Sequence, residues 1–459
     1  MRIPEELLAR LREHRQEHLL AHWENLEDPE REHLLGELEQ IDFAKVLSLY
    51  ARRRERVGAL AAHNLRPLDF LKLADQSASQ ISRWERTASG EFRAGRVAAL
   101  LVAGGQGTRL GHNGPKGSFP FAIPSGRTLF ELQALRLLNL GRRFGKPVPW
   151  LVMTSPINDA DTRAFFAEHG FFGLDEKDVF FFSQGQLPAV DESGRLLLEA
   201  PDQLALVPDG NGGVFAALAR SGGLDWLKSR GVRSVFLYSV DNAVVRVCDP
   251  ALIGFHVESG KAVTCPVVRK AGPGERVGIF VDTDEGSCVA EYSDIPAEMR
   301  DATDERGHLL FDGANLAIHV LDVGVLEDAA AQALPYHSAF KRVPWCREDG
   351  TIVLPEKENA WKFEQFMFDV FPRFGKMAAL EVERSDWFSP IKNSSGNDSP
   401  ATAIRMMLDL HARWLVEAGV LAPDDPRKFE ISPLWSYAGE NLRGRTISEL
   451  IEKGAVTQA

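Results

Sequence analysis

The chain has 459 residues, more than a single hydrophobic core usually organises, so two or three domains are expected. Hydrophobic residues make up 44% of the chain and charged residues 26%, a composition that excludes collagen-like, disordered and coiled-coil proteins. The formal net charge of −12 argues against a nucleic-acid partner, because binding to a phosphate backbone needs a basic face.

The four cysteines are far apart in the sequence and form no C-x-x-C pair. This spacing argues against structural zinc and a disulfide framework, and it favours reduced thiols. The N-terminal stretch "MRIPEELLAR" is charged, with no apolar signal sequence, and no apolar run reaches the length of a membrane span. We therefore expect a cytoplasmic protein without a membrane partner.

Residues 1–92 are expected to form a helical N-terminal region, because leucines recur at helical spacing in "EELLARLREHRQEHLLAHWENL". His14, His18 and His22 recur every four residues in this stretch. Charged residues lie between them, so we interpret them as a solvated helix face and not as a metal site. The composition changes at "SGEFRAG", and the apolar run "RVAALLVAG" that follows predicts a buried strand.

Helices and strands alternate over residues 93–385, which we expect to form the main domain. A helix at 127–145 begins with the capping-box pattern of Thr128 and Glu131 and ends at Gly145. Further strands are expected at 148–155, 178–184 and 232–242, and further helices at 158–170, 212–222 and 250–260. Such alternation predicts an α/β protein whose largely parallel sheet is covered by helices.

After residue 262 the expected strands follow one another more closely, which predicts an antiparallel extension of the sheet. These strands are expected at 262–270, 276–282, 288–294 and 313–321. We expect a helix at 361–371 and a strand at 377–385. Residues 386–459 are expected to form a small C-terminal domain.

The glycine-rich stretch "LVAGGQGTRLGHNGPKGS" directly follows the first predicted strand. It is not a P-loop, because its Lys116 follows a proline where a P-loop has Gly-Lys-Ser/Thr. It is not a dinucleotide fingerprint either, because Leu110 stands where the third glycine is required. A dehydrogenase is therefore a weak alternative.

The remaining pattern, G-G-x-G-T-R-L-G followed by Pro-Lys, is the signature of nucleotidyltransferases. Glycines in this density let backbone N–H groups approach a triphosphate without interference from side chains. Arg109 and Lys116 can then supply positive charge to phosphoryl oxygens, where negative charge builds up during transfer.

Other segments, in the same order along the chain, extend this similarity from about residue 15 to residue 440. They include "SQGQLPAV", "PDGNGGVFAAL", "VDN", "AEYSDIP", "FSPIKN" and "ISPLWSYAGENL". The sequence resembles the UDP-N-acetylhexosamine pyrophosphorylases, within the wider family of UTP-dependent sugar-1-phosphate uridylyltransferases. The resemblance implies a Rossmann-like core of the glycosyltransferase-A type with a mixed sheet, a helical N-terminal region and a small C-terminal domain.

The resemblance also implies a reaction, in which UTP and a hexose-1-phosphate give a UDP-sugar and pyrophosphate. The acceptor phosphate is already anionic, so we expect neither a general base nor a covalent intermediate. Catalysis would rest on positioning and on charge stabilisation by Mg²⁺ and the cations Arg109, Lys116 and Lys392.

The resemblance further implies a role for each matching residue. The nucleotide would be bound by Val102, Ala103, Gly104, Gly105 and Lys362, with Gln184 and Gly210 at the uracil edge. The sugar would be contacted by Asn211, Glu291, Tyr292 and Asn315. Asp241 would hold Mg²⁺, a hard cation that prefers carboxylate and phosphate oxygens.

One position departs from the family pattern. Asn315 is retained, but Ile318 stands where the family has a second asparagine. The loss of an amide leaves recognition of an N-acetyl group open, and glucose-1-phosphate or another hexose-1-phosphate stays possible as substrate. A second alternative is a regulator that binds a nucleotide sugar on the same fold without catalysis.

Overall fold

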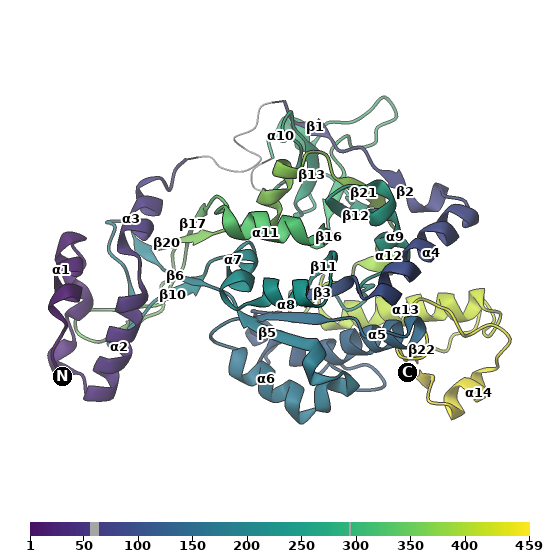
Figure 1. Cartoon of the computed structure of the whole chain (residues 1–459), viewed down its shortest axis with the longest axis horizontal. Coiled ribbons are helices and arrows are strands. Elements are labelled where there is room, and N and C mark those ends of the chain that lie inside the picture. The colour runs from purple at the N-terminus through teal and green to yellow at the C-terminus, as the bar shows by residue number, and fades with distance from the viewer. Residues whose placement is uncertain (56–63, 293–294) are drawn as a thin grey trace. The chain divides into compact units, whose positions relative to one another are not determined.

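The computed structural model describes residues 1–55, 64–292 and 295–459 of an α/β protein (Figure 1). Residues 56–63, within the predicted N-terminal helical region, and residues 293–294, at the end of the predicted strand 288–294, lie outside this description. In the described part of the chain, no helix has the length and apolarity needed to cross a membrane.

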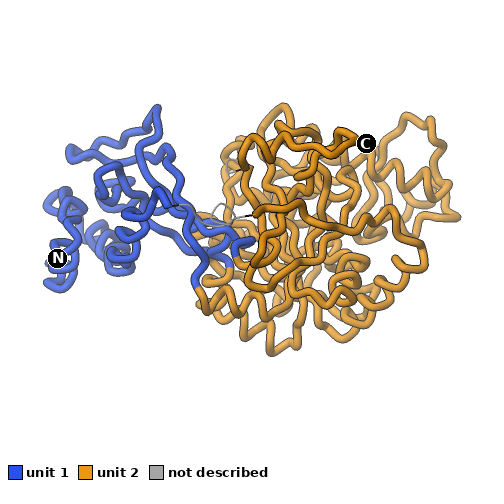
Figure 2. Tube along the Cα trace, turned by 90° about the horizontal axis from the view of Figure 1, so that it is seen from above, with its two compact units in different colours: residues 1–61, 184–214, 333–369 blue, residues 62–183, 215–332, 370–459 orange. Residues whose placement is uncertain are grey.

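The chain divides into two compact units, each assembled from three separate segments (Figure 2). Unit 1 consists of residues 1–61, 184–214 and 333–369, and unit 2 of residues 62–183, 215–332 and 370–459. The boundaries predicted at residues 92 and 385 do not coincide with the boundaries of these units.

Unit 2 is built on a twelve-stranded mixed sheet. Its strands are β1 (Arg66–Pro67), β2 (Leu71–Lys72), β3 (Val97–Val102), β4 (Trp150–Thr154), β5 (Val179–Ser183), β11 (Ser234–Ser239), β12 (Val263–Arg269), β13 (Ile279–Asp282), β14 (Ser287–Ala290), β15 (Gly313–Asn315), β16 (Ile318–Asp322) and β21 (Ala378–Glu381). The pairs β11–β3, β3–β4 and β4–β5 are parallel. The pairs β11–β16, β12–β15 and β13–β14 are antiparallel. The predicted parallel core with an antiparallel extension is confirmed.

One face of this sheet is covered by α4 (Ala78–Ala94), α5 (Leu129–Phe144), α6 (Asp159–Glu168) and α9 (Pro250–Ser259), which share an apolar cluster with alternate strand residues. The start of α5 is capped as predicted, since Oγ1 of Thr128 accepts from the Glu131 N–H at 3.3 Å. The Glu131 carboxylate instead accepts from Arg127. Gly145, with φ of 75°, ends the helix.

The other α-helices of unit 2 are mostly short. They are α8 (Gly223–Ser229), α10 (Ala297–Arg300), α11 (Val323–Ala331), α12 (Arg384–Trp387), α13 (Pro400–Glu417) and α14 (Ile447–Glu452). Helix α7 (Gly213–Arg220) begins in the last two residues of a unit 1 segment. The C-terminal strands β22 (Phe429–Ile431) and β23 (Val456–Gln458) form an antiparallel pair, with α14 between them in the sequence. These C-terminal elements share an apolar cluster with the start of α5 and with Ala243 and Val244, so they have no separate core.

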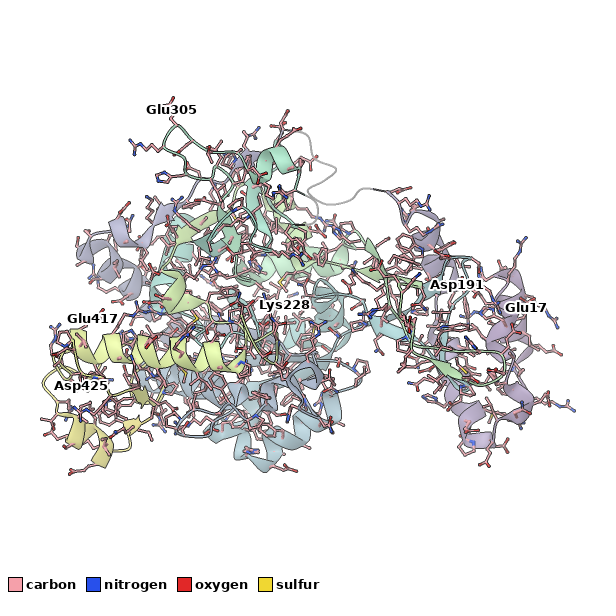
Figure 3. All side chains as sticks on the ribbon, turned by 180° about the vertical axis from the view of Figure 1, so that it is seen from behind. Glu17, Asp191, Lys228, Glu305, Glu417 and Asp425 are labelled. Atoms are coloured by element: carbon pink, nitrogen blue, oxygen red, sulfur yellow. The ribbon has the colours of Figure 1, made fainter. Side chains whose placement is uncertain are left out.

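Unit 1 contains α1 (Glu5–Glu13), α2 (Asp28–Gln40) and α3 (Phe43–Ala51). Its strands are β6 (Gln186–Pro188), β7 (Val190–Asp191), β8 (Leu198–Ala200), β9 (Gln203–Leu204), β10 (Leu206–Pro208), β17 (His337–Lys341), β18 (Trp345–Cys346), β19 (Ile352–Val353) and β20 (Ala360–Glu364). Leucines of the helices pack in one apolar cluster with Val190 and Phe363, which explains why the unit is discontinuous. Glu17 and Asp191, both labelled in Figure 3, belong to this unit.

The predicted helix at 361–371 is wrong. Its first part is the strand β20, which pairs with β17 and β7. A 3-10 helix, Met367–Phe374, follows it. Ala360 and Phe363 pack into different apolar clusters, so both faces of this strand reach the core, although Lys362 and Glu364 lie on the same face as Ala360. Such a run fits a buried helix and a buried strand equally well, and only its partners distinguish them.

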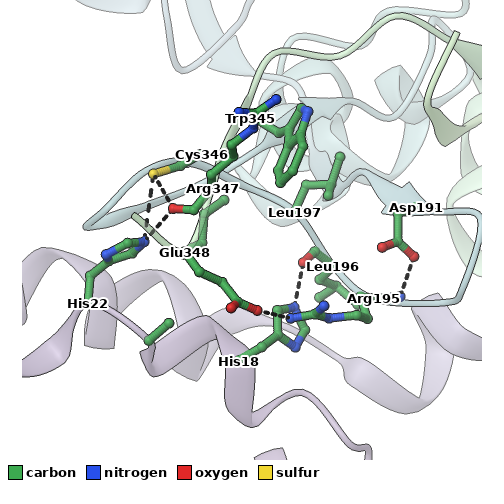
Figure 4. A pocket seen from close by; sticks show the side chains of 12 residues that line it. His18, His22, Asp191, Arg195, Leu196, Leu197, Trp345, Cys346, Arg347 and Glu348 are labelled. Carbon is green, nitrogen blue, oxygen red and sulfur yellow. Dashed lines mark hydrogen bonds and ion pairs between the residues drawn. The ribbon is translucent and has the colours of Figure 1, made fainter. Parts of the chain in front are cut away.

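The predicted solvated histidine face is also wrong. Arg15 has φ of 56°, and α1 ends before it, so the three histidines do not share one helix. His18 Nε2 donates to the Leu196 carbonyl at 2.8 Å, and His22 Nε2 donates to the Arg347 carbonyl at 2.9 Å (Figure 4). Both rings line a cavity of about 70 Å³, whose walls contain none of the predicted site residues.

Candidate active site

The glycine-rich stretch that follows β3 folds back on itself. The Gly107 N–H donates to the Gly114 carbonyl at 2.9 Å, and the Lys116 N–H donates to the Gly105 carbonyl at 3.0 Å. Gln106 and Pro115 face each other as an antiparallel bridge between these two bonds. The fold-back therefore brings the backbone of Lys116 to the first glycines of the loop.

A buried asparagine from the next strand connection holds the start of this loop. Asn158 is fully buried, and its Nδ2 donates to the carbonyls of Ala103 at 2.9 Å and Gly105 at 3.2 Å. Its Oδ1 accepts from the Ser155 N–H at 2.8 Å. Sequence reasoning missed Asn158, because an asparagine before a helix is ordinarily a cap.

The glycines of the loop differ in why the position requires a glycine. A Cβ at Gly107 would lie 2.8 Å from His112 Cδ2, and one at Gly117 would overlap the Phe130 ring. A Cβ at Gly105 would meet nothing within 4 Å. The protein itself therefore does not require a glycine at position 105, whereas the close approach of a ligand would.

The other predicted residues of this stretch lie around the loop. Val102 ends β3 and is half-buried, Ala103 is buried, Gly104 is half-buried, and the Arg109 side chain is exposed.

Lys116 and Asp241 lie side by side. Their Nζ and Oδ2 atoms are 3.6 Å apart, and their side chains are 18% and 24% exposed. The pairing follows from the sheet, because β3 and β11 are parallel neighbours with Val102 opposite Ser239. The loops after both strands therefore leave the same edge of the sheet, the usual position of a binding site in such folds. The structure thus brings together the predicted catalytic lysine and the predicted metal ligand.

The residues at this edge fit a magnesium ion that is held mainly by substrate. In the described ranges, no group of three or more histidine, cysteine, aspartate or glutamate side chains could form a metal site on its own. Asp241 offers one carboxylate. Mg²⁺ commonly takes one or two protein carboxylates, and phosphate and water oxygens complete its octahedron.

The segment that carries Lys392 is bonded to the segment that carries Asp241. The Ile391 N–H donates to the Asp241 carbonyl at 2.9 Å, and the Ala243 N–H donates to the Ser389 carbonyl at 3.1 Å. The Lys392 side chain is exposed, with Nζ 5.7 Å from the centroid of the Phe388 ring. No ion pair joins Lys392 to another described residue.

Two side chains of α5 support the Asp241 loop from the buried side. Gln133 Nε2 donates to the Val240 carbonyl at 3.2 Å, and the Arg136 guanidinium donates to the Ala243 carbonyl at 3.3 Å. Burial lowers the pKa of Arg136 to about 10, so the guanidinium is still protonated at neutral pH. A buried positive charge therefore lies behind the loop that carries the Asp241 carboxylate.

Two of the predicted sugar contacts lie close together at the ends of β14 and β15. The Asn315 N–H donates to the Gly278 carbonyl at 2.9 Å, and a Cβ at Gly278 would lie 3.2 Å from Glu291 Oε1. Asn315 Oδ1 already accepts from the Ala317 N–H at 2.9 Å, which leaves its NH₂ group for a ligand. Tyr292 is 48% exposed.

Ile318 does not belong to this group. It is 1% exposed and packs in the main apolar cluster of unit 2, opposite Tyr238 of β11. Its apolar side chain is therefore explained by the core, and it gives no information on which sugar is bound.

The remaining predicted residues belong to unit 1. The Met367 N–H donates to Asn211 Oδ1 at 3.0 Å, and the Gly212 N–H donates to the Gln365 carbonyl at 2.8 Å. Gly210 has φ of 88°, and a Cβ there would overlap the Gln365 carbonyl. The segment 210–213 is thus pressed against the backbone that follows β20.

Gln184 and Lys362 also belong to unit 1. Gln184 is buried and lies two residues before the start of β6, and Lys362 is a half-buried residue of β20 opposite Ala339 of β17.

A glycine-rich loop and a lysine–carboxylate pair at one edge of a mixed α/β sheet are the features of the nucleotidyltransferase class of enzymes. The comparison with protein families agrees, since residues 41–442 match the family described as UTP–glucose-1-phosphate uridylyltransferase. The chain belongs to this family.

Relatives across eukaryotes are similar over nearly their whole length. The chain is 40% identical to human UDP-N-acetylhexosamine pyrophosphorylase-like protein 1, with 95% of this chain and 94% of the relative covered. It is 36% identical to UDP-N-acetylglucosamine diphosphorylase 1 of Arabidopsis thaliana, with 96% and 91% covered. The solved structure of the Trypanosoma brucei uridine diphosphate N-acetylglucosamine pyrophosphorylase superposes with a TM-score of 0.82 at 30% identity, over 98% of this chain and 96% of that one.

Proposed function

We propose that the protein is a uridylyltransferase that converts UTP and N-acetylglucosamine-1-phosphate to UDP-N-acetylglucosamine and pyrophosphate, with glucose-1-phosphate as the second candidate acceptor. The Lys116–Asp241 pair beside the open Gly105 is the observation that carries the proposal, because it places a cation and a carboxylate at a loop suited to a triphosphate. Relatives at 30–40% identity carry N-acetylglucosamine or N-acetylhexosamine in their names, which favours that acceptor.

The reaction exchanges one bond at phosphorus for another. An oxygen of the sugar phosphate attacks the α-phosphorus of UTP in line, and the bond from that phosphorus to the bridging oxygen breaks, so that pyrophosphate leaves. Arg109, Lys116 and Lys392 would stabilise the charge that spreads over the phosphoryl oxygens. The attacking oxygen is already anionic, so no residue needs to remove a proton.

Substrate binding would divide among the remaining residues as the family resemblance implies. Val102, Ala103, Gly104, Gly105 and Lys362 would bind the nucleotide, with Gln184 and the Gly210 backbone at the uracil edge. Asn211, Glu291, Tyr292 and Asn315 would contact the sugar. Oδ1 of Asn315 and Oδ1 of Asn211 each accept a backbone N–H, and no hydrogen bond joins either NH₂ group to another described residue, which is consistent with such contacts.

Mg²⁺ is part of the proposal, with Asp241 as its protein ligand. When bound, the ion would neutralise charge on the phosphate oxygens. Lys116 would then lie close to the same oxygens, because its Nζ is 3.6 Å from the Asp241 carboxylate.

The proposal is tested by measuring pyrophosphate release from UTP with N-acetylglucosamine-1-phosphate, glucose-1-phosphate and galactose-1-phosphate in parallel. We expect the highest kcat/KM with N-acetylglucosamine-1-phosphate. Release with none of the three, together with tight binding of a UDP-sugar, would instead support the non-catalytic regulator.

A further inference from the structure

Asn242, the residue after Asp241, is an almost fully buried asparagine whose side chain bonds a distant part of the chain. It is 3% exposed. Its Nδ2 donates to the Trp387 carbonyl at 2.6 Å, and its Oδ1 accepts from the Ser389 N–H at 2.9 Å. The amide therefore uses both its donor and its acceptor on the segment that leads to Lys392.

These side-chain bonds extend a very short backbone pairing. Asn242 faces Pro390 in an isolated antiparallel bridge, which is flanked by one backbone bond from Ala243 and one to Asp241. Proline has no N–H, so the backbone of this segment offers few further bonds. The amide of Asn242 contributes two of the four hydrogen bonds that join residues 241–243 to residues 387–391.

The far end of the Lys392 loop is also fixed. The N–H groups of Lys392 and Asn393 donate to the Asp398 carbonyl at 2.6 and 3.0 Å, and Asp398 has φ of 53°. Ser399 then caps α13 by accepting from the Thr402 N–H. The backbone around Lys392 is therefore held on one side by the Ile391–Asp241 backbone bond and the Asn242 side chain, and on the other side by the start of α13.

We propose that Asn242 is a positioning residue that fixes Lys392 relative to Asp241, an inference that rests on the uridylyltransferase function proposed above. A side-chain amide suits this position, because it can donate to the Trp387 carbonyl and accept from the Ser389 N–H at the same time. Misplacing a charged group by about 1 Å can cost roughly 100-fold in rate.

The chain offers a matched control in Asn139. This asparagine is 7% exposed, and its Nδ2 donates to the carbonyls of Pro433 and Leu434 at 3.0 and 3.2 Å. It also joins a central element of unit 2 to a C-terminal segment, but the segment that it holds carries no predicted site residue. Asn139→Ala therefore removes a comparable set of bonds without touching Lys392.

The test is a cycle of four proteins: wild type, Asn242→Ala, Lys392→Ala and the double variant, with Asn139→Ala as the control. We expect Asn242→Ala to lower kcat for pyrophosphate release roughly 100-fold while KM for UTP changes less than about 3-fold. The double variant should be no slower than Lys392→Ala within about 3-fold, because Asn242 acts through that lysine. Asn139→Ala should lower the melting temperature to a similar degree and keep kcat within about 3-fold of wild type.

If Asn242→Ala does not fold, Asn242→Ser takes its place, since it removes the amide that spans Trp387 and Ser389 without adding a charge. The inference on Asn242 is overturned if the losses of kcat in the two single variants multiply in the double variant, or if the Asn242 variant has the kcat of wild type. Neither result contradicts the proposed function. A wild-type protein that releases no pyrophosphate with any sugar phosphate overturns the proposed function and this inference with it.

Discussion

Two glycine-rich segments of the chain look alike in sequence and differ in what their glycines do. In residues 210–213, the protein itself excludes side chains: Gly210 has φ of 88°, and Cβ atoms at Gly210 and Gly212 would run into the Gln365 backbone. In residues 104–117, Gly107 and Gly117 are excluded from having side chains in the same way, but Gly105 faces open space. A glycine can therefore be required either because the protein leaves no room for a side chain or because a ligand approaches the backbone. Only a glycine without a steric reason in the protein, such as Gly105, points to a ligand.

The largest effect is expected at Lys116, at the charged end of residues 104–117. Lys116→Ala should lower kcat for pyrophosphate release roughly 1,000-fold, about 4 kcal/mol of transition-state stabilisation, because its charge acts on the transferring phosphoryl group. Steady-state assays and a thermal melt of the same preparation check this. Lys228→Ala, which removes an exposed lysine of α8 paired with Glu327, is the control and should change neither (Figure 3). A kcat of Lys116→Ala within 3-fold of wild type would contradict the catalytic role proposed for this lysine.

In residues 210–213, a substitution is expected to lower stability. Gly210→Ala should lower the free energy of unfolding by roughly 3 kcal/mol, because it combines a left-handed backbone with overlap at Gln365. Gly36→Ala, in α2 of the same unit, meets nothing within 4 Å and should gain roughly 0.5–1 kcal/mol. Denaturant melts of both variants measure the free energy of unfolding. Equal values for the two variants would contradict the conclusion that the protein sterically requires a glycine at position 210.

Gly105→Ala examines a glycine of the loop for which the surrounding protein gives no steric reason. We expect its melting temperature to equal that of wild type, because a Cβ there meets no protein atom within 4 Å. Its KM for UTP should rise about 10-fold, roughly 1.4 kcal/mol, if the backbone at this position approaches the triphosphate. Gly107→Ala is the counterpart, and it should lose stability because of His112. An unchanged KM for UTP in a stable Gly105→Ala protein would contradict a close approach of the triphosphate to the backbone at this position.

The smallest effect concerns nucleotide specificity next to residues 210–213. The Asp209 N–H donates to the Gly185 carbonyl at 3.1 Å, so Gln184 adjoins residues 210–213. Gln184→Ala should reduce the preference for UTP over CTP by about 5-fold, since a neutral amide contributes roughly 1 kcal/mol per hydrogen bond. Competition assays with both nucleotides measure the ratio. Equal use of UTP and CTP by the wild-type protein would contradict the uracil role.

The sequence predicted those parts of the molecule that local patterns specify. The strand before the glycine loop, the Thr128 cap and the Gly145 end of α5 are confirmed, because each depends on residues a few positions apart. The juxtaposition of Lys116 and Asp241 is a finding of the structure, and a topological rule explains it, since loops after parallel neighbours share one edge of the sheet.

What the sequence did not predict depends on partners far along the chain. β20 was mistaken for a helix, because only its pairing with β17 and β7 distinguishes an apolar strand from an apolar helix. His18 and His22 contact carbonyls that lie 178 and 325 positions away. Asn158 and Asn242 were missed for the same reason, since their bonds reach residues 55 and 145 positions away.

The discontinuity of unit 1 has a consequence for biosynthesis. The apolar cluster around α1, α2 and α3 is completed only when Phe363 is present, about 300 residues after α3 ends. At about 5–20 residues per second, the ribosome needs roughly 15–60 s to synthesise that interval. During this time the leucines of the N-terminal helices lack part of their native partners. Translation speed and chaperone capture of the nascent chain should therefore influence the yield of the protein more than they influence proteins whose domains are continuous.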